Sequence, residues 1–287
     1  MQKIDTSIEE LSKEELIDLV YELNKSIKVQ EDFLLNISHD LKSPINVVLS
    51  VLQCLKYLDR KDNKQDVINK RKEYYEIIKR NSQKMLKLIN NLIDTTKLEG
   101  NYYKINKSNE NIISVVEDTV ESIEKYAEQK DIQLIFDTSD EECITAFDPE
   151  CIDRVVMNLL SNAIKFSPIG SEIKIYTLVE EETVSISVTD EGPGIKKEDQ
   201  EIIFNRFAQA SQVSKGEHSG SGIGLDLVNC LVKLHNGRVE LNSDVGKGST
   251  FTIILPIEKI DDNNGKNILI NKCKEEKIEI EFSDIYL

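Results

Sequence analysis

No run of apolar residues in the chain approaches the roughly 18 that a membrane-spanning helix needs. The first residues also lack the basic and apolar regions of a signal peptide. We therefore expect the chain as given to be a cytoplasmic protein without a transmembrane segment.

Basic residues are also in short supply. The 287 residues include 36 Lys and Arg against 52 Asp and Glu, which gives a formal net charge of −16. Nonspecific attraction to nucleic acid or to an anionic membrane needs clustered positive charge, so we expect a protein or a small molecule as partner and no nucleic acid. The five cysteines are widely spaced and include no CxxC pair, which argues against a zinc site and favours reduced thiols.

The first hundred residues contain two long helical patterns. Over residues 34–55 apolar side chains recur at steps of three and four, and residues 1–30 lead into this pattern without Gly or Pro. A polar break covers residues 59–66, and a second periodic run ends at Gly100, as helices often end at glycine. This pattern predicts an αα-hairpin. Its apolar stripe needs a second copy to cover it, so we expect a homodimer with a four-helix bundle.

After Asn101 the pattern becomes mixed and predicts a separate α+β domain that ends near Pro256. Helices are expected near 111–130 and over 149–166, and a further helix follows a glycine-rich stretch. The expected strands are Ile132–Phe136, Glu172–Val179, Val184–Thr189, Arg238–Leu241 and Thr250–Leu255, and beyond the domain Ile278, Ile280 and Phe282 alternate like a short strand.

His39 lies on the polar side of the first predicted helix. At about 100° per residue it projects about 160° from the centre of the apolar stripe, so we expect it to face solvent. Asp40 and Ser43 share its neighbourhood, and Pro44 removes a backbone hydrogen bond from the same region. An imidazole that attacks with one ring nitrogen becomes more basic when a carboxylate accepts the proton of the other, and Asp40 is the candidate carboxylate. The alternative for His39 is an ordinary surface histidine, and the alternative for Asp40 is a solvated charge on the helix surface.

Asn158 and Asn162 are four residues apart on the predicted helix 149–166. Asparagine is a weak helix former, but its amide oxygen suits Mg²⁺, which takes few protein ligands and completes its shell with phosphate and water. Lys165 could reach a phosphate, and Phe166 could flank a base. The alternative is that both amides are caps or face solvent.

Two glycine-containing segments also suit a nucleotide. Asp190 ends an alternating strand beside Gly192 and Gly194, so a carboxylate that could accept the amine of adenine stands next to backbone that can approach a flat ligand. The segment Gly220-Ser221-Gly222-Ile223-Gly224 opens a helix, where free N–H groups favour phosphate. Either segment alone is a weak signal, because DxGxG is also a common turn. The asparagine segment, the Asp190 segment and the glycine-rich segment, in this order, are together a stronger signal for a nucleotide site.

Together these motifs resemble the sensor histidine kinases of two-component systems, whose catalytic domain shares its fold with the DNA gyrase, Hsp90 and MutL ATPases. The resemblance implies a multidomain α and α+β chain: a dimeric helical hairpin, which forms a four-helix bundle in the dimer, followed by an α/β-sandwich ATP-binding domain. It covers residues 30–257 through an H-box Ser38–Pro44, an N-box from Asn158 to Lys165, a G1-box Asp190–Gly194, an F-box Ile203–Phe207 and a G2-box Gly220–Leu225.

By this resemblance His39 accepts the γ-phosphate of ATP, Asp40 is the acid–base residue, and Ser43 stands where relatives position water for dephosphorylation. Asn158 is the Mg²⁺ ligand and Asp190 reads adenine. The phosphate then passes to an aspartate in the receiver domain of a response regulator. Other residues implied at the ATP site, whose lid is residues 204–224, are Asn162, Lys165, Phe166, Gly192, Gly194, Phe204, Gly220, Ser221, Gly222, Gly224 and Leu225.

The resemblance also divides the chain. Residues 1–29 are a helical signalling segment, residues 30–100 the dimerisation and phosphoacceptor hairpin, residues 105–257 the ATP-binding domain, and residues 258–287 a tail without an assigned role. Because residues 1–29 are too short for a typical sensory domain, we expect input through them or from a separate sensory partner.

Two hypotheses of other classes stay open. The first is an ATPase or ATP-driven clamp of the same fold, in which the nucleotide drives a change of shape, but the cluster at 39–44 does not suit it. The second is a catalytically silent interaction module, against which the intact glycines and both asparagines argue. His218 and His235 are expected to be structural or exposed.

Overall fold

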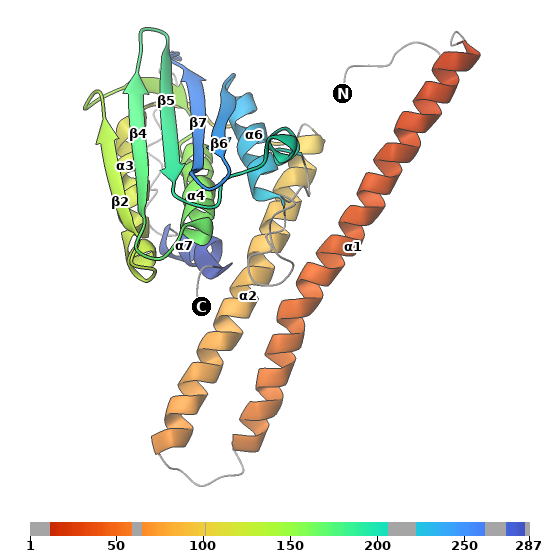
Figure 1. Ribbon diagram of the computed structural model, residues 1–287, viewed down its shortest axis with the longest axis vertical. Coiled ribbons are helices and arrows are strands. Elements are labelled where there is room, and N and C mark those ends of the chain that lie inside the picture. The colour runs from red at the N-terminus through yellow and green to blue at the C-terminus, as the bar shows by residue number, and fades with distance from the viewer. Residues whose placement is uncertain (1–11, 59–64, 101, 206–221, 262–273, 285–287) are drawn as a thin grey trace. The chain divides into compact units, whose positions relative to one another are not determined.

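The computed structural model describes residues 12–58, 65–100, 102–205, 222–261 and 274–284 (Figure 1). The chain divides into two compact units, Met1–Ser43 and Pro44–Leu287. Both predicted long helices are confirmed: α1 is Lys13–Leu58, with Pro44 inside it, and α2 is Gln65–Glu99. None of the described helices is both long and apolar enough to cross a membrane.

The apolar stripes of the two long helices remain partly open to solvent in the single chain. Ile45 and Leu52 of α1 and Leu86, Ile89 and Ile93 of α2 are all exposed. The prediction that the hairpin does not bury its own stripe is therefore confirmed. Apolar side chains exposed in a row along two helices are typical of a surface that is covered in an assembly.

A sheet with five strands forms the frame of the second half, in the order β2-β4-β5-β7-β6. The pair β2–β4 is parallel and the other neighbours are antiparallel. A separate antiparallel pair joins β1 to β3. The bounds of the strands are β1 Ser108–Asn111, β2 Gln133–Thr138, β3 Ile144–Phe147, β4 Glu172–Val179, β5 Thr183–Asp190, β6 Arg238–Asp244 and β7 Gly248–Pro256.

Three helices cover one face of this sheet: α3 (Ile112–Glu128), α4 (Pro149–Phe166) and α6 (Gly224–Leu234), while α5 (Lys197–Gln200) is a short turn of helix (Figure 1). Every second residue of β5 is buried against the helices, as the alternation predicts. The predicted α/β sandwich is confirmed. Strands β1 and β3 and helix α5 were not predicted. In the case of β1, all four residues are polar, so no alternation marks them as a strand.

Helix α4 carries most of the candidate site, and both of its ends are fixed. Its first turn is capped by Asp148, whose side chain accepts from the backbone N–H of Glu150 and Cys151, and Pro149 occupies the first helical position. At the other end the ammonium group of Lys130 donates to the carbonyls of Ile164 and Lys165, at 2.7 and 3.1 Å. Cations at this end also interact favourably with the helix dipole.

His235 has a structural role, as predicted. The side chain is buried at the end of α6; its Nε2 accepts from the backbone N–H of Asp148 at 3.0 Å, and its Nδ1 donates to the carbonyl of Leu231 at 2.8 Å. Since a carbonyl can only accept, the ring is neutral with its proton on Nδ1. His235 thus links the end of α6 to the start of α4.

We expect this link to make the fold sensitive to acid. Burial lowers the pKa of His235 below the ordinary value of 6.5. Below that pH the unfolded chain takes up a proton that the folded protein does not, so stability falls as pH decreases, by at most about 1.4 kcal/mol at pH 5.5. Thermal unfolding between about pH 7.5 and about pH 5.5 should show a steeper loss in the native protein than in His235→Gln. Equal slopes would contradict this assignment.

The prediction of a strand at residues 278–282 was wrong. These residues lie in helix α7 (Lys274–Glu281) and in the short 3-10 turn η3 (Phe282–Asp284) that follows it. Ile278 and Phe282 are one helical turn apart, so both point inward, and both are buried. An alternation over three apolar residues is too short to distinguish a strand from a helix with two inward positions.

Candidate active site

The imidazole of His39 is exposed on α1, as predicted from its angle to the apolar stripe. Its side chain is 84% exposed, and its Nδ1 lies 3.5 Å from Oδ1 of Asp40. The carboxylate therefore faces Nδ1, and Nε2 is the ring nitrogen on the side away from it. Ser43, one turn further along the same helix, is also exposed.

Asp190 is buried at the end of β5 and has one of its oxygens fixed by the backbone. Its Oδ1 accepts from the N–H of Gly192 at 2.7 Å and from the N–H of Ser249 at 3.3 Å. Burial raises the pKa of this carboxyl group, and the two N–H donors oppose that effect. Since both donors bind the same oxygen, Oδ2 is the atom presented to a ligand, and it can accept from an amine.

Two serines that sequence reasoning missed hold the surroundings of Asp190. Ser243 Oγ accepts from the N–H of Ile195 at 2.9 Å, donates to the carbonyl of Gly248 at 2.9 Å and lies 3.0 Å from Ser249 Oγ. Through these hydrogen bonds, Ser243 and Ser249 connect the loop after β5 to the turn between β6 and β7. The available signal was the inward position of Ser249 in the closing hairpin, directly after a glycine-rich turn.

Asn158 is buried in the middle of α4 beside the first residue of α6. Its Nδ2 donates to the carbonyl of Arg154 at 2.9 Å, which turns Oδ1 away from its own helix. A Cβ added to Gly224 would lie 2.9 Å from this Oδ1, so a larger residue there would displace the amide oxygen. Among the described residues, the N-cap of α6, Ile223, makes no side-chain cap hydrogen bond, and the first N–H groups of a helix are the ones that attract anions.

The loop after β5 reaches the end of α4 in the same region. A Cβ added to Gly192 would lie 2.7 Å from Oδ1 of Asp190 and 3.3 Å from the carbonyl oxygen of Phe166. Lys165 Nζ lies 5.5 Å from the centre of the Phe166 ring. Asn162, Lys165 and Phe166 are partly exposed. The structure therefore brings the predicted asparagine segment, the aspartate loop and the start of α6 together.

Some predicted site residues are placed elsewhere or are not described. Phe204 packs edge-on against Phe251 of β7, with ring centres 6.2 Å apart, so it anchors the start of the predicted lid to the core. Leu225 is packed against the same core, and Gly222 is described with a φ of 67°. Residues 206–221 of the predicted lid, which include His218, Gly220 and Ser221, lie outside the described residues.

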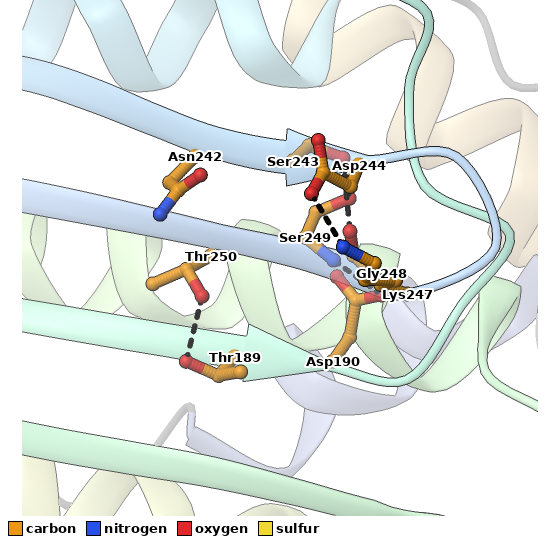
Figure 2. A pocket seen from close by; sticks show the side chains of 9 residues that line it. All are labelled: Thr189, Asp190, Asn242, Ser243, Asp244, Lys247, Gly248, Ser249 and Thr250. Atoms are coloured by element: carbon orange, nitrogen blue, oxygen red, sulfur yellow. Dashed lines mark hydrogen bonds and ion pairs between the residues drawn. The ribbon is translucent and has the colours of Figure 1, made fainter.

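A small polar pocket of about 190 Å³ lies on the other side of Asp190 (Figure 2). Figure 2 shows the hydrogen bond between the hydroxyl groups of Thr189 and Thr250 at the edge of this pocket. The two oxygens are 3.0 Å apart. These two residues alternate with buried Val188 and Phe251, so the pocket opens on the face of the sheet that the helices do not cover. It contains no residue of α4, and it is not the predicted nucleotide site.

Two segments of the chain match known families. Residues 29–101 match the family described as His Kinase A (phospho-acceptor) domain. Residues 147–259 match the family described as Histidine kinase-, DNA gyrase B-, and HSP90-like ATPase. His39 falls in the first match, while Asn158, Asp190 and Gly224 fall in the second.

Curated relatives and a solved structure agree with these matches. Hybrid signal transduction histidine kinase D of Dictyostelium discoideum is 34% identical over 255 residues, which cover 86% of this chain and 16% of the relative. The autoinducer 2 sensor kinase/phosphatase LuxQ of Vibrio vulnificus is 30% identical over 246 residues, covering 83% of this chain and 28% of the relative. The chain therefore spans less than a third of the length of either protein.

The Acinetobacter baumannii histidine kinase AdeS has a similar fold, with a TM-score of 0.57 at 23% identity over 79% of this chain and 98% of that one. A phosphoacceptor domain and a histidine kinase-type ATPase domain thus follow each other in one chain. The chain belongs to the sensor histidine kinase family.

Proposed function

We propose that this chain binds ATP between α4, the loop after β5 and α6, and transfers the γ-phosphate to Nε2 of His39. The phosphate then passes to an aspartate in the receiver domain of a response regulator. The observation that carries the proposal is the exposed imidazole of His39 with Asp40 at its Nδ1, in a phosphoacceptor domain that is followed by an ATPase-type domain.

The nucleotide is held by parts of three elements. Oδ2 of Asp190 accepts a hydrogen bond from the exocyclic amine of adenine, because Oδ1 already accepts from two backbone N–H groups. Phe166 and the backbone at Gly192 and Gly194 flank the base. The phosphates lie toward the start of α6, where the first N–H groups of the helix and its dipole attract anions, and toward Lys165.

The amide oxygen of Asn158 fits a Mg²⁺ ion that accompanies the phosphates. It is turned toward a space that a Cβ on Gly224 would fill. Within the described part of the chain, no three His, Cys, Asp or Glu side chains gather as a metal site. Amide and phosphate oxygens together are a donor set that Mg²⁺ accepts. When bound, Mg²⁺ would supply positive charge to the phosphate oxygens.

The chemistry at His39 follows from its tautomer. With the proton on Nδ1, the lone pair of Nε2 attacks the γ-phosphorus, and the bond to the bridging oxygen breaks, leaving its electron pair on ADP. The ring becomes more acidic as it is phosphorylated, and the carboxylate of Asp40 accepts the Nδ1 proton. The present separation of 3.5 Å needs to shorten only slightly for a hydrogen bond.

The hairpin is proposed to dimerise with a second copy. Ile45, Leu52, Leu86 and Ile93 form exposed apolar surface on α1 and α2, and pairing would bury it in a four-helix bundle. In this scheme residues 30–100 form the dimerisation and phosphoacceptor part, residues 105–257 the ATP-binding part, and residues 1–29 the signalling segment.

Ser43 is proposed to assist removal of phosphate from the regulator. Its hydroxyl lies four residues after His39, one helical turn away, and is exposed. A hydroxyl there can orient a water molecule toward an acyl phosphate held near the imidazole. The relative LuxQ is described as both a kinase and a phosphatase.

The proposal is tested by incubating the purified chain with γ-labelled ATP and Mg²⁺. We expect protein-bound label that is lost in acid and kept in base, because a phosphoramidate is labile to acid, and label that moves to a receiver domain when one is added. ATP turnover without such a label would support an ATPase or clamp instead. Absence of ATP binding would support a silent interaction module.

A further inference from the structure

The C-terminal segment α7–η3 is part of the ATPase-type domain's packing. Phe282 is 0% exposed, and its ring centre lies 5.1 Å from that of Tyr126 in α3. Ile278 is buried in the same cluster, and α7 also packs against α4. Residues 274–284 are thus fixed to the helices of the domain, beside α4 (Figure 1).

The polar side of the same segment contacts α2. Glu279 accepts a hydrogen bond from Gln83 at 2.8 Å and pairs with Lys79 at 2.9 Å. Lys87 donates to the carbonyl of Glu281 at 2.6 Å and lies 3.2 Å from its carboxylate. The side chains of Lys87 and Glu281 are only 14% and 12% exposed, so water screens this pair less than a surface pair.

A second attachment lies further along the same stripe of α2. Arg154 of α4 is bonded to Asp94 and, at 3.0 Å, to Asn91. The contacted residues of α2 are at positions 79, 83, 87, 91 and 94, steps that keep them on one helix face. They extend over about 22 Å at the usual rise per residue. Two contacts this far apart hold the domain on α2 in a defined orientation.

The two sides of α7–η3 differ in chemistry. The side facing the ATPase-type domain is apolar and buried, whereas Glu279 and Glu281 contact α2 through ion pairs and hydrogen bonds. Polar contacts can exchange for water without exposing apolar surface, as in interfaces between domains that move. Separation therefore leaves α7–η3 on the ATPase-type domain and breaks its contact with α2.

From this arrangement we infer that α7–η3 is an autoinhibitory strap, which fastens the ATP-binding domain to α2 and must release α2 before phosphate is transferred. The inference rests on the proposed function. The nucleotide has to approach His39 and then to leave it, so that a receiver domain can reach the same imidazole. A domain held on α2 in a single orientation cannot do both.

The strap is tested by the rate at which full-length protein acquires acid-labile label from γ-labelled ATP. Lys87→Glu places like charges at the least exposed pair and is expected to raise the initial rate about fivefold. Lys87→Glu combined with Glu281→Lys restores an opposite-charge pair and should return the rate to the native value. Lys277→Glu is the matched control, because Lys277 lies on the same helix but pairs with Glu150 of α4.

Thermal unfolding of each variant shows whether the domain is intact, and Lys79→Glu, at a more exposed pair, replaces Lys87→Glu if that variant does not fold. An unchanged or slower rate in the α2 variant would overturn the strap alone, as would a double variant that stays fast. Folded native protein and variants that bind ATP but acquire no label would overturn the proposed function, and the strap with it.

Discussion

His39→Ala is expected to abolish incorporation of acid-labile phosphate, by at least about 1,000-fold, while leaving ATP binding unchanged. The imidazole supplies the nucleophile, and its replacement leaves no ring nitrogen at this point of α1. The residues proposed to hold ATP are in the other compact unit of the chain, so nucleotide affinity should not respond. The measurement is the amount of label per chain after the protein is separated from free nucleotide in base. Nucleotide affinity is measured as the dissociation constant for ADP, which carries no γ-phosphate to transfer.

The matched control for this substitution is Ser38→Ala. Ser38 adjoins His39, and its hydroxyl only donates to the carbonyl of Leu34 within the helix. We expect this variant to retain most of the label, because no group of the proposed chemistry is removed. Label that persists in His39→Ala would show that another side chain accepts the phosphate.

Local patterns predicted those parts of the site in which one element presents the chemistry. Asn158 and Asn162 were singled out because asparagines four apart are unusual on a helix, and α4 covers Pro149–Phe166 as expected. The exposure of His39 followed from its angle on the helix alone, and its 84% exposed side chain agrees. Such features depend on spacing within a segment, which the sequence contains.

Features that depend on contacts between distant segments were missed. Ser243 and Ser249 support Asp190 across more than fifty residues of chain, and neither belongs to a recognisable motif. The contacts of the C-terminal segment were also missed, because its partners on α2 are almost two hundred residues away in sequence. Nothing in residues 274–284 alone indicates which helix they will contact.

Asp190→Asn should weaken ATP binding about 100-fold while preserving the fold. The asparagine has the same shape, and its amide oxygen can still accept from the N–H groups of Gly192 and Ser249. That arrangement directs the amide NH₂ toward the base in place of the carboxylate Oδ2. Two donors then face each other, because the exocyclic group of adenine is also an amine, and neither finds an acceptor.

The same geometry predicts a change of preference among nucleotides. Inosine triphosphate carries a carbonyl where ATP has the amine, and the asparagine NH₂ can donate to it. Affinities of native protein and Asp190→Asn for both nucleotides, measured by titration calorimetry, should therefore show a ratio of ATP to inosine triphosphate binding that falls in the variant. Equal losses for the two nucleotides in a folded variant would mean that Asp190 supports the loop and does not contact the base.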